Sequence, residues 1–498
     1  MIKFLQQLYN RLTTNGSTEE QAIQGGIWVA AINVGDRLLQ LGKVVVLARI
    51  LSPGAFGLLG IALLVLSGLR RFSNLGFDEA LIQHKEENVD EYLNTAWLVK
   101  IARGILIAGI AFSAAPYLAT FFNEPQASPL IRVIGIVNLI LALRNPAIVY
   151  FRKDLNFHKE FGYKISARLA DFFVAVGFAL VYRSVWALIA GIAAMNLVQF
   201  MLSYLILDYR PKFEFKLSYA QEMFIFGKWM FAQAVLGFLL IDGDDAFVGW
   251  FFTASALGYY QIAYRYSNAP ATEITQVIRR VAFPAFSKVQ GEIDKLRSGF
   301  FRVVHLTAMI SFPMAAGIIV IAPQFVPVIF GSQWEPMIPL MQVLAFWGAS
   351  RSLADNFRAV FKAVGHPEYI SYILVVQITC VAVGIYPAAG HFGVVGVASV
   401  IAGQALLSIP IGVYITLRII DGSATKYLRL ILLPAITSTL MIITVFGIDQ
   451  YILNQENIFT LSILISVGVL SYVIYMLLIE QYTDYEFIGI YRKIARSL

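Results

Sequence analysis

The sequence is poor in charge and in cysteine, which excludes several kinds of protein at once. Charged residues make up 14% of its 498 residues, whereas about 25% is usual for a soluble domain. The single cysteine, Cys380, lies in an apolar run, so a disulfide framework and a cysteine-based metal site are excluded. The five histidines are scattered without the spacing of metal ligands. We therefore expect no metal and no cofactor, apart from a coupling ion discussed below.

Motifs for nucleotide chemistry and nucleic-acid binding are also missing. No G-x-x-x-x-G-K-[ST] loop occurs, so the sequence predicts no nucleotide hydrolysis. The longest loops, near 208–228 and 285–298, could each hold one surface helix, which leaves no room for a catalytic domain. No basic run interleaved with aromatics is found, so we expect no nucleic-acid partner. Residues 1–12 lack the apolar region of a cleavable signal peptide, and their apolar stripe is typical of a membrane-surface helix.

The sequence is instead rich in long apolar runs, which recur from near residue 22 to near residue 480. Hydrophobic residues make up 58% of the chain, and the mean hydropathy is +0.70. Single soluble cores stop growing near ~250–300 residues, so a bilayer is needed to cover this surface. A span needs ~20 mainly apolar residues. The sequence predicts about fourteen spans, at about 22–48, 55–75, 92–121, 129–150, 163–182, 186–207, 224–252, 256–284, 299–322, 335–362, 369–389, 393–417, 427–447 and 457–480. Twelve spans with two interfacial segments is the alternative, because 256–284 and 335–362 carry several charges.

Lysine and arginine are distributed unevenly between the two sets of loops, which predicts the orientation. The termini and the loops on their side carry 25 of the 38 positive residues, whereas the opposite loops carry only Arg49 and Arg183. The same asymmetry accounts for the net charge of +7 without a polyanionic partner. We predict a multi-pass protein of the plasma (inner) membrane with both termini in the cytoplasm.

An internal repeat divides the chain. Residues 26–62 and 227–263 align without a gap at an offset of 201, and 11 of 37 positions are identical, among them Trp28/Trp229 and Gly57/Gly258. Six spans separate the copies, so they share one orientation, as in transporters whose two halves form a substrate site between them. An old duplication without functional use of that interface is the alternative. The predicted segments are an interfacial segment at 1–21, an N-lobe at 22–207, a cytoplasmic linker at 208–223, a C-lobe at 224–417, and two further spans with a cytoplasmic tail at 418–498.

Several charges fall within the predicted spans, where an ionisable side chain needs a partner or a wet cavity. Arginine binds phosphate through two charge-assisted hydrogen bonds, so positive charge at this depth suits a diphosphate or an acidic sugar. The candidate substrate-binding residues are Arg37, Lys43, Arg144, Arg265, Arg351 and Arg358. Carboxylates beside them could carry H⁺ or Na⁺, and the candidates for ion coupling are Asp36, Asp242, Asp244, Asp245 and Asp355. For each charge, a structural salt bridge between helices is the alternative.

Particular segments resemble a known family of exporters. ARILSPGAFGLLGIA (48–62), LGFDEALIQ (75–83) and LNTAWLV (93–99) are similar to the start of the polysaccharide-transport family, and RKDLNFHKEF (152–161) is similar to its basic segment after the fourth span. DDAFVGWFFTASALGYYQIAYRYSNAP (244–270) and AFPAFSKVQ (282–290) resemble its second half. These are the Wzx-like flippases of the multidrug/oligosaccharidyl-lipid/polysaccharide exporter superfamily. The likeness covers most of residues 20–420 and is greatest to the colanic- or teichuronic-acid-exporter-like branch.

The resemblance implies an all-α, V-shaped fold of two six-helix lobes around a central cavity, followed by two C-terminal helices. It implies that the chain is no enzyme and flips a polyprenyl-diphosphate-linked oligosaccharide repeat unit to the outer leaflet. The partners implied are the lipid-linked oligosaccharide, membrane lipid and polysaccharide polymerase machinery. An ion-coupled drug or organic-cation antiporter of the same fold is one alternative. A membrane enzyme, either a polymerase or a glycosyltransferase, is another, and in a glycosyltransferase Asp244 and Asp245 would be the metal-binding pair.

Overall fold

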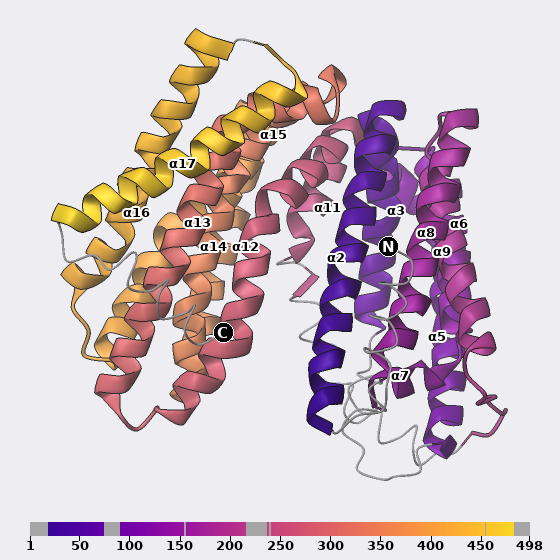
Figure 1. The fold of residues 1–498 in the computed structure, drawn as a ribbon. Helices are drawn as coiled ribbons and strands as arrows, with labels where there is room; N and C mark the ends of the chain where they lie inside the picture. The colour runs from indigo at the N-terminus through magenta and orange to yellow at the C-terminus, as the bar shows by residue number, and fades with distance from the viewer. Residues whose placement is uncertain are drawn as a thin grey trace, which may run out of the picture. The chain divides into compact units, whose positions relative to one another are not determined.

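The computed structural model describes residues 18–73, 90–153, 156–215, 237–238, 241–453 and 455–482, and all regular elements in these ranges are helices (Figure 1). The all-α prediction is thereby confirmed. Three predicted features lie largely outside the described residues: the surface segment at 1–21, most of the seventh span, and the tail beyond residue 482.

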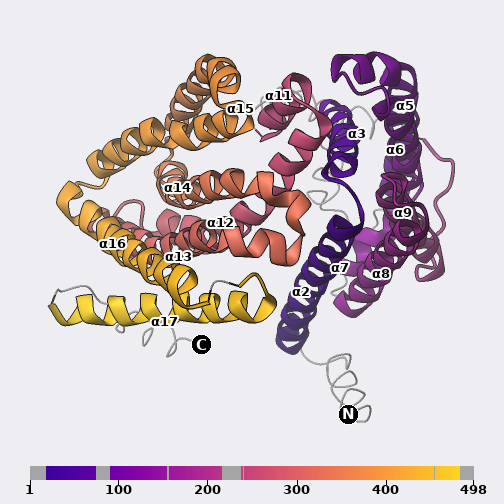
Figure 2. The same ribbon diagram turned by 90° about the horizontal axis from the view of Figure 1, so that it is seen from above.

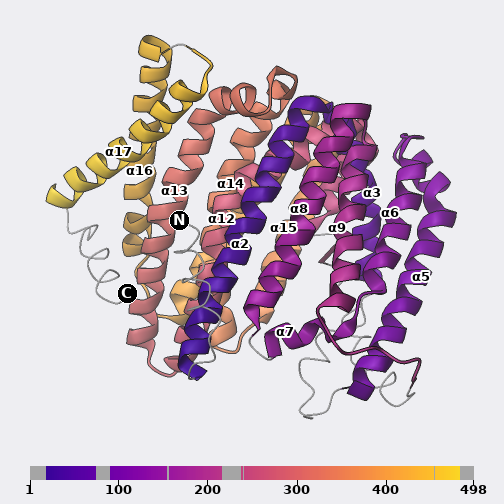
Figure 3. The same ribbon diagram turned by 45° about the vertical axis from the view of Figure 1, so that its right-hand side comes forward.

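The first compact unit spans Met1–Gly258. Its helices are α2 (Thr18–Ile50), α3 (Pro53–Phe72), α5 (Asp90–Phe121), α6 (Ala127–Ala142), the 3-10 helix η1 (Pro146–Val149), α7 (Tyr150–Lys153), α8 (Phe157–Tyr182), α9 (Trp186–Leu205) and α11 (Gly243–Phe251). Helix α2 packs on α8, α8 on α9, α9 on α6, and α6 on both α5 and α3. Figure 3 shows α2, α8 and α9 side by side, with the short α7 at the lower end of the bundle.

Local sequence signals set the ends of these helices. Helix α3 begins at Pro53, whose fixed φ suits the first turn, and the Ser52 hydroxyl accepts a hydrogen bond from the Ala55 amide at 3.4 Å. Helix α6 ends at Ala142, earlier than the span predicted at 129–150. The cause is Asn145 followed by Pro146, because a residue before proline is driven out of the helical region. Asn145 instead caps η1 by accepting from the Ala147 amide at 3.0 Å.

The second compact unit spans Tyr259–Leu498. Its helices are α12 (Ala254–Lys288, which begins in the first unit), α13 (Ile293–Ile329), the 3-10 helix η2 (Ser332–Met337), α14 (Ile338–Ala363), α15 (Glu368–Ile419), α16 (Ala424–Ile448), the π-helix η3 (Asp449–Leu453) and α17 (Ile458–Tyr482). Helix α15 is broken at Gly393, with φ 62° and ψ −148°, which separates the two spans predicted at 369–389 and 393–417. Helices α16 and α17 pack on each other and on α13 (Figure 2).

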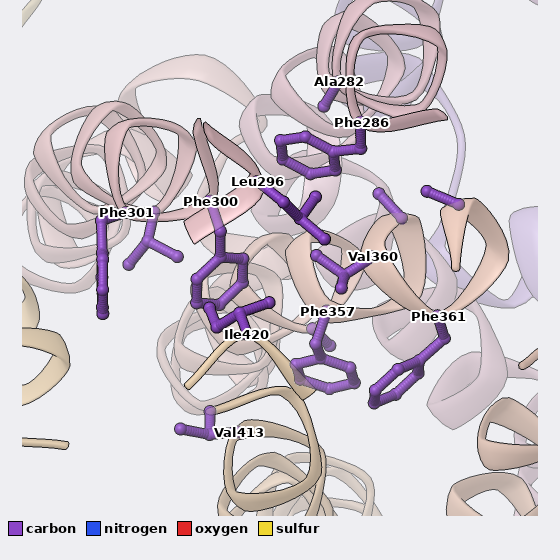
Figure 4. Packing of buried hydrophobic residues seen from close by; sticks show 14 of the residues in the cluster. Ala282, Phe286, Leu296, Phe300, Phe301, Phe357, Val360, Phe361, Val413 and Ile420 are labelled. Carbon is purple, nitrogen blue, oxygen red and sulfur yellow. The ribbon is translucent and has the colours of Figure 1, made fainter. Parts of the chain in front are cut away.

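An aromatic core holds α12, α13, α14, α15 and α16 together in the second unit (Figure 4). The Phe300 ring of α13 stacks on Tyr427 of α16, with centroids 6.2 Å apart and planes 9° apart. Phe357 and Phe361 of α14 pack at 5.8 Å, and Gly412 of α15 lies against the Phe357 ring. A β-carbon on Gly412 would lie 2.6 Å from that ring, so only glycine lets α14 and α15 approach this closely.

Eight of the described helices are long and apolar enough to cross a membrane by length and composition: Pro53–Phe72, Leu93–Phe121, Phe157–Tyr182, Trp186–Leu205, Ile293–Ile329, Glu368–Ile419, Ala424–Ile452 and Ile458–Tyr482. One of these, Glu368–Ile419, contains both predicted spans of α15. Helices α2, α12 and α14 are long enough but more polar, and they carry most of the charges chosen as candidate site residues. The residues that weaken these three as membrane spans are therefore the ones that suggested function.

Residues equivalent in the two sequence repeats touch each other within the first unit. A β-carbon on Gly57 would lie 1.6 Å from the Ala254 carbonyl oxygen, and one on Gly258 would lie 2.2 Å from the Pro53 carbonyl oxygen. Gly57 and Gly258 are a repeated pair, and so are positions 53 and 254, so the two contacts are reciprocal. Within the first unit, the backbones of α3 and of the first turn of α12 therefore meet through glycines present in both copies.

The boundary between compact units differs from the predicted lobe boundary. Helix α11, which the repeat assigns to the C-lobe, falls in the first unit. The reason is local packing: Trp250 stacks on Phe121 at 6.2 Å, and the Ala254 amide donates to Glu124 Oε1 at 2.8 Å. Part of the linker predicted at 208–223 lies outside the described residues, so the lobe limits stay a prediction.

Candidate functional site

Helices α2 and α8 are joined by a network of four charged side chains. The Lys43 ammonium lies 2.6 Å from Asp171 Oδ2 and 2.8 Å from its Oδ1. Arg168 Nε lies 2.6 Å from Asp36 Oδ1, and its Nη1 lies 3.2 Å from Asp171 Oδ2. Asp36 and Lys43 are two turns apart on one face of α2, so they meet two residues one turn apart on α8. We call these four residues the α2–α8 ion network.

The α2–α8 ion network balances its own charge. It contains two carboxylates and two cations, and Asp171 at its centre has no exposed surface. Gly191 of α9 closes over it, since a β-carbon there would lie 2.6 Å from Asp171 Oδ1. Two predicted site residues, Asp36 and Lys43, are therefore engaged in interhelical ion pairs. Their assignment to coupling and substrate binding remains a prediction beside this structural role.

A second feature of the first unit is a pocket of about 930 Å³ among α3, α5, α6, α7, α8 and α9. Among the residues that the structure describes, its charged lining consists of six cationic side chains and one carboxylate: Arg70, Lys100, Arg103, Arg144, Lys153, Lys164 and Glu160. The lining thus has a formal excess of five positive charges. We call this the N-lobe cationic pocket. The predicted site residue Arg144 is part of it.

Chain topology explains why these cations gather. Helices α3, α6 and α9 run toward this end of the bundle and finish near it, whereas α5 and α8 begin there. Arg70 occupies the last turn of α3, and Arg144 follows the C-terminus of α6 by two residues. Cations are favoured at helix C-termini, where the backbone carbonyls carry partial negative charge. It is also the side that the lysine and arginine distribution assigns to the cytoplasm.

Neutral groups hold the guanidinium groups of the pocket. Arg70 Nε donates to Asn138 Oδ1 at 2.6 Å, and Arg144 Nη2 donates to Asn196 Oδ1 at 2.8 Å. Arg103 Nε donates to the Ser73 hydroxyl at 2.9 Å. Because these acceptors are uncharged, the hydrogen bonds orient the side chains and do not themselves neutralise them. Arg144 Nε and the Tyr163 hydroxyl are buried neighbours, and neither has a hydrogen bond of satisfactory geometry among the described residues.

The predicted carboxylates of the seventh span lie at the start of α11. Asp242 forms an ion pair with Arg71 of α3, with Oδ2 and Nη2 3.1 Å apart. Asp244 and Asp245 occupy the first turn of α11 and are half-buried. Asp242 therefore joins α11 to the end of α3 that also contributes to the cationic pocket. Among the described residues, no group of three His, Cys, Asp or Glu side chains is arranged to hold a metal ion.

The remaining candidates lie in the second unit. Asp355 of α14 is 3% exposed and lies 3.3 Å from Nη1 of Arg358, one turn further along the helix. Asn356 beside it accepts from the Thr307 hydroxyl of α13 at 3.2 Å. Arg351 is half-buried on the same helix, whereas Arg265 of α12, like Arg37 of α2, is exposed. These candidates lie on α2, α12 and α14, which are not among the eight helices apolar enough to cross a membrane, and both their membrane depth and their functional roles remain predictions.

Sequence reasoning missed most of the cationic pocket. It assigned Arg70, Lys153 and Lys164 to cytoplasmic loops, as part of the orientation signal. A clue was available in Lys100 and Arg103, which lie three residues apart inside the predicted span at 92–121. Two cations at such a spacing share one face of a helix, so both should face the same anionic or hydrated surroundings.

Solved structures with the same fold are transporters. The structure of "Lipid II flippase MurJ, inward closed conformation" matches with a TM-score of 0.70 at 12% identity, covering 91% of this chain and 99% of that one. A multidrug resistance MATE family transporter of the MOP superfamily, in an inward-facing conformation, matches with a TM-score of 0.59 at 14% identity, covering 78% of this chain and 96% of that one. At these identities the likeness concerns the fold, and it confirms the predicted exporter fold class.

Proteins of polysaccharide biosynthesis are similar in sequence. The lipopolysaccharide biosynthesis protein WzxC of Escherichia coli (strain K12) is 29% identical over 349 residues, which cover 70% of this chain and 71% of that protein. The teichuronic acid biosynthesis protein TuaB of Bacillus subtilis (strain 168) is 24% identical over 415 residues, covering 82% and 85%. A family model described as "Polysaccharide biosynthesis protein" matches residues 46–339. The chain therefore belongs to this family of polysaccharide biosynthesis membrane proteins.

Proposed function

We propose that this protein flips a polyprenyl-diphosphate-linked oligosaccharide repeat unit from the cytoplasmic to the outer leaflet, for the synthesis of an exopolysaccharide or O-antigen-type glycan. The observation that carries the proposal is the combination of family membership with a MurJ-like fold over 91% of the chain. Relatives named for lipopolysaccharide, teichuronic acid and succinoglycan biosynthesis or transport support it. The cationic pocket supplies positive charge suited to a diphosphate.

Transport without enzyme chemistry is the second part of the proposal. Family membership and the MurJ-like fold support a transporter, which would move its substrate across the bilayer and form no glycosidic bond. The two halves of such repeats expose a site alternately to either side of the membrane. A gradient of H⁺ or Na⁺ would supply the free energy. Asp355 is the best-supported ion-coupling residue, because it is nearly fully buried in a helix that also carries Arg351 and Arg358.

The cellular setting follows from the charge distribution. We place the protein in the plasma (inner) membrane with both termini in the cytoplasm, because 25 of 38 cations lie on the side of the termini and two on the other. Polysaccharide polymerase machinery would receive the flipped unit. Fusions of alkaline phosphatase and green fluorescent protein to residue 498 test the orientation: only the fluorescent protein should be active there, and an active phosphatase would contradict it.

Gene deletion and complementation test the transport. Deletion should abolish a surface glycan and accumulate lipid-linked units on the cytoplasmic side, and the wild-type gene should restore export. Continued export in a strain without paralogues would refute the proposal. In the complemented strain, Arg265→Ala and Arg351→Ala should reduce export more than they reduce protein level. Loss of the protein itself in both variants would instead assign these arginines a structural role.

An ion-coupled drug or organic-cation antiporter is the competing function, and the MATE-like fold is the observation that favours it. Such a transporter needs acidic groups that face its cargo. Asp242, the clearest candidate, is paired with Arg71, and the pocket of the first unit has a cationic lining. Overexpression in a dye-sensitive strain separates the two functions. Resistance that disappears in Asp242→Asn would favour the antiporter, and no resistance is the result expected here.

A further inference from the structure

The N-lobe cationic pocket and the α2–α8 ion network handle charge in opposite ways, although both lie in the first unit. In the network, each cation lies within 3.2 Å of a carboxylate, and the four charges cancel. In the pocket, Arg70 and Arg144 are held by the amide oxygens of Asn138 and Asn196. Those neutral acceptors fix the two arginines in place, and no carboxylate in the described part of the chain forms an ion pair with either. Partly buried positive charge of this kind is costly unless an anion completes it.

The one carboxylate that the described residues contribute to the pocket does not change this balance. Glu160 lies 2.7 Å from the Lys164 ammonium, one turn away on α8, so it is already engaged with a cation of the lining. The Arg70 guanidinium is close enough to those of Arg103 and Arg144 to be affected by their positive charge. Like charges gathered this closely lower the stability of the empty pocket and raise its affinity for an anion.

We propose that the N-lobe cationic pocket is a phosphate-binding site in which Arg70 and Arg144 are the principal donors. A guanidinium has five N–H donors in a fixed fork and binds phosphate oxygens in pairs. Arg144 Nε and the Tyr163 hydroxyl, buried without a well-formed hydrogen bond among the described residues, are two donors that an anion would satisfy. The volume of about 930 Å³ exceeds what one phosphate fills and admits a diphosphate with an attached sugar.

Two ligands have this chemistry: the diphosphate of the lipid carrier and the headgroup of an acidic phospholipid. The first source rests on the proposed function, and the second does not. In either case the pocket would capture its ligand at the end of the bundle where α3, α6 and α9 finish. The lysine and arginine distribution assigns this end to the cytoplasm. The pocket would therefore act within one lobe, before any movement of the halves.

The test measures the binding of inorganic pyrophosphate to the full-length protein in phosphatidylcholine nanodiscs by isothermal titration calorimetry. The wild type should bind saturably, and Arg70→Gln and Arg144→Gln should each weaken binding at least about tenfold, because a hydrogen bond to a charged group is worth a decade or more in affinity. Arg132→Gln is the matched control: Arg132 lies on α6 outside the pocket lining and donates to the Phe112 carbonyl at 3.3 Å. It should bind like the wild type.

A variant that should bind pyrophosphate more tightly shows that weaker binding in the other variants is not caused by misfolding. Glu160→Gln removes the carboxylate found in the described part of the lining, so pyrophosphate should bind several-fold more tightly, which a damaged protein would not do. The proposal is overturned if the wild type shows no saturable binding, if Arg144→Gln and Arg132→Gln bind alike, or if Glu160→Gln fails to tighten binding.

Native mass spectrometry of the purified protein then identifies the source of the phosphate. Selective loss of co-purified polyprenyl diphosphate species from Arg144→Gln would identify the lipid carrier. Selective loss of phosphatidylglycerol would identify an acidic lipid, and both results support a phosphate site. Unchanged lipids in Arg144→Gln would overturn it. These experiments measure binding and do not depend on export. A failure of the proposed transport in the export assay would therefore leave the phosphate site untouched, and the two proposals can be refuted separately.

Discussion

Substitution of Asp171 should show whether the charges of the α2–α8 ion network stabilise the fold or take part in transport. Its carboxylate has no exposed surface and lies 2.6 Å from Lys43 and 3.2 Å from Arg168. In Asp171→Asn, Arg168 keeps Asp36 at 2.6 Å, whereas Lys43 loses the carboxylate that holds it between α2 and α8. Removing one partner of a buried ion pair costs about 3–5 kcal/mol. The lower figure alone reduces the folded-to-unfolded ratio more than 100-fold, since 1.4 kcal/mol is about a factor of ten.

A double-mutant cycle gives the pair energy. Asp171→Asn and Lys43→Gln each leave the network with an unbalanced charge, whereas the double variant restores neutrality and keeps the Asp36–Arg168 pair. The double variant should therefore be less destabilised than the sum of the two singles, by at least ~1.5 kcal/mol. Asp421→Asn is the control, because that side chain is 95% exposed and should change stability by no more than ~0.5 kcal/mol.

The assay is reversible unfolding in mixed detergent micelles, with export measured in parallel. A stability of Asp171→Asn within ~0.5 kcal/mol of the wild type would refute this reasoning, and so would additive single effects. A third result would assign a different role. If Asp171→Asn and Asp36→Asn stay stable but lose the dependence of export on an ion gradient, the network takes part in coupling.

Three further changes probe the backbone and the polar interior. Gly57→Leu should abolish the monodisperse peak in size-exclusion chromatography, because a β-carbon at this position would lie 1.6 Å from the Ala254 carbonyl oxygen. The control Gly109→Ala should behave like the wild type, because the space around Gly109 is open. Gly393→Ala should lower the free energy of unfolding by about 1–3 kcal/mol, since its φ of 62° and ψ of −148° are essentially restricted to glycine; an unchanged melting temperature would contradict this. Asn145→Ala should cost about 2–4 kcal/mol, because it removes the bond to the Tyr209 carbonyl at 2.7 Å and the cap on η1 in a buried site; a loss below ~1 kcal/mol would show that other groups replace them.

The sequence by itself determined the class of fold and most of the helices. A bilayer core accepts only segments with internally satisfied backbone hydrogen bonds and a fixed minimum length, so apolar runs translate directly into helices. Local residues also set several ends, as Pro53 does for α3 and Gly393 for the break in α15. The fourth span was predicted too long because the stop signal, Asn145 before Pro146, lies inside an otherwise apolar run.

Only the tertiary structure decided which charges meet. Lys43 and Asp171 are 128 residues apart, and Arg144 and Asn196 are 52 apart, so no local pattern links them. Their pairing follows from α2 packing on α8 and α6 on α9. The sequence could show that Lys43 and Arg144 are costly within a membrane. Whether such a charge meets a carboxylate or a neutral amide depends on the helix packed beside it. A carboxylate partner gives an ion pair that stabilises the lobe. A neutral amide orients the cation and leaves it able to bind an anionic ligand, as we propose for Arg144.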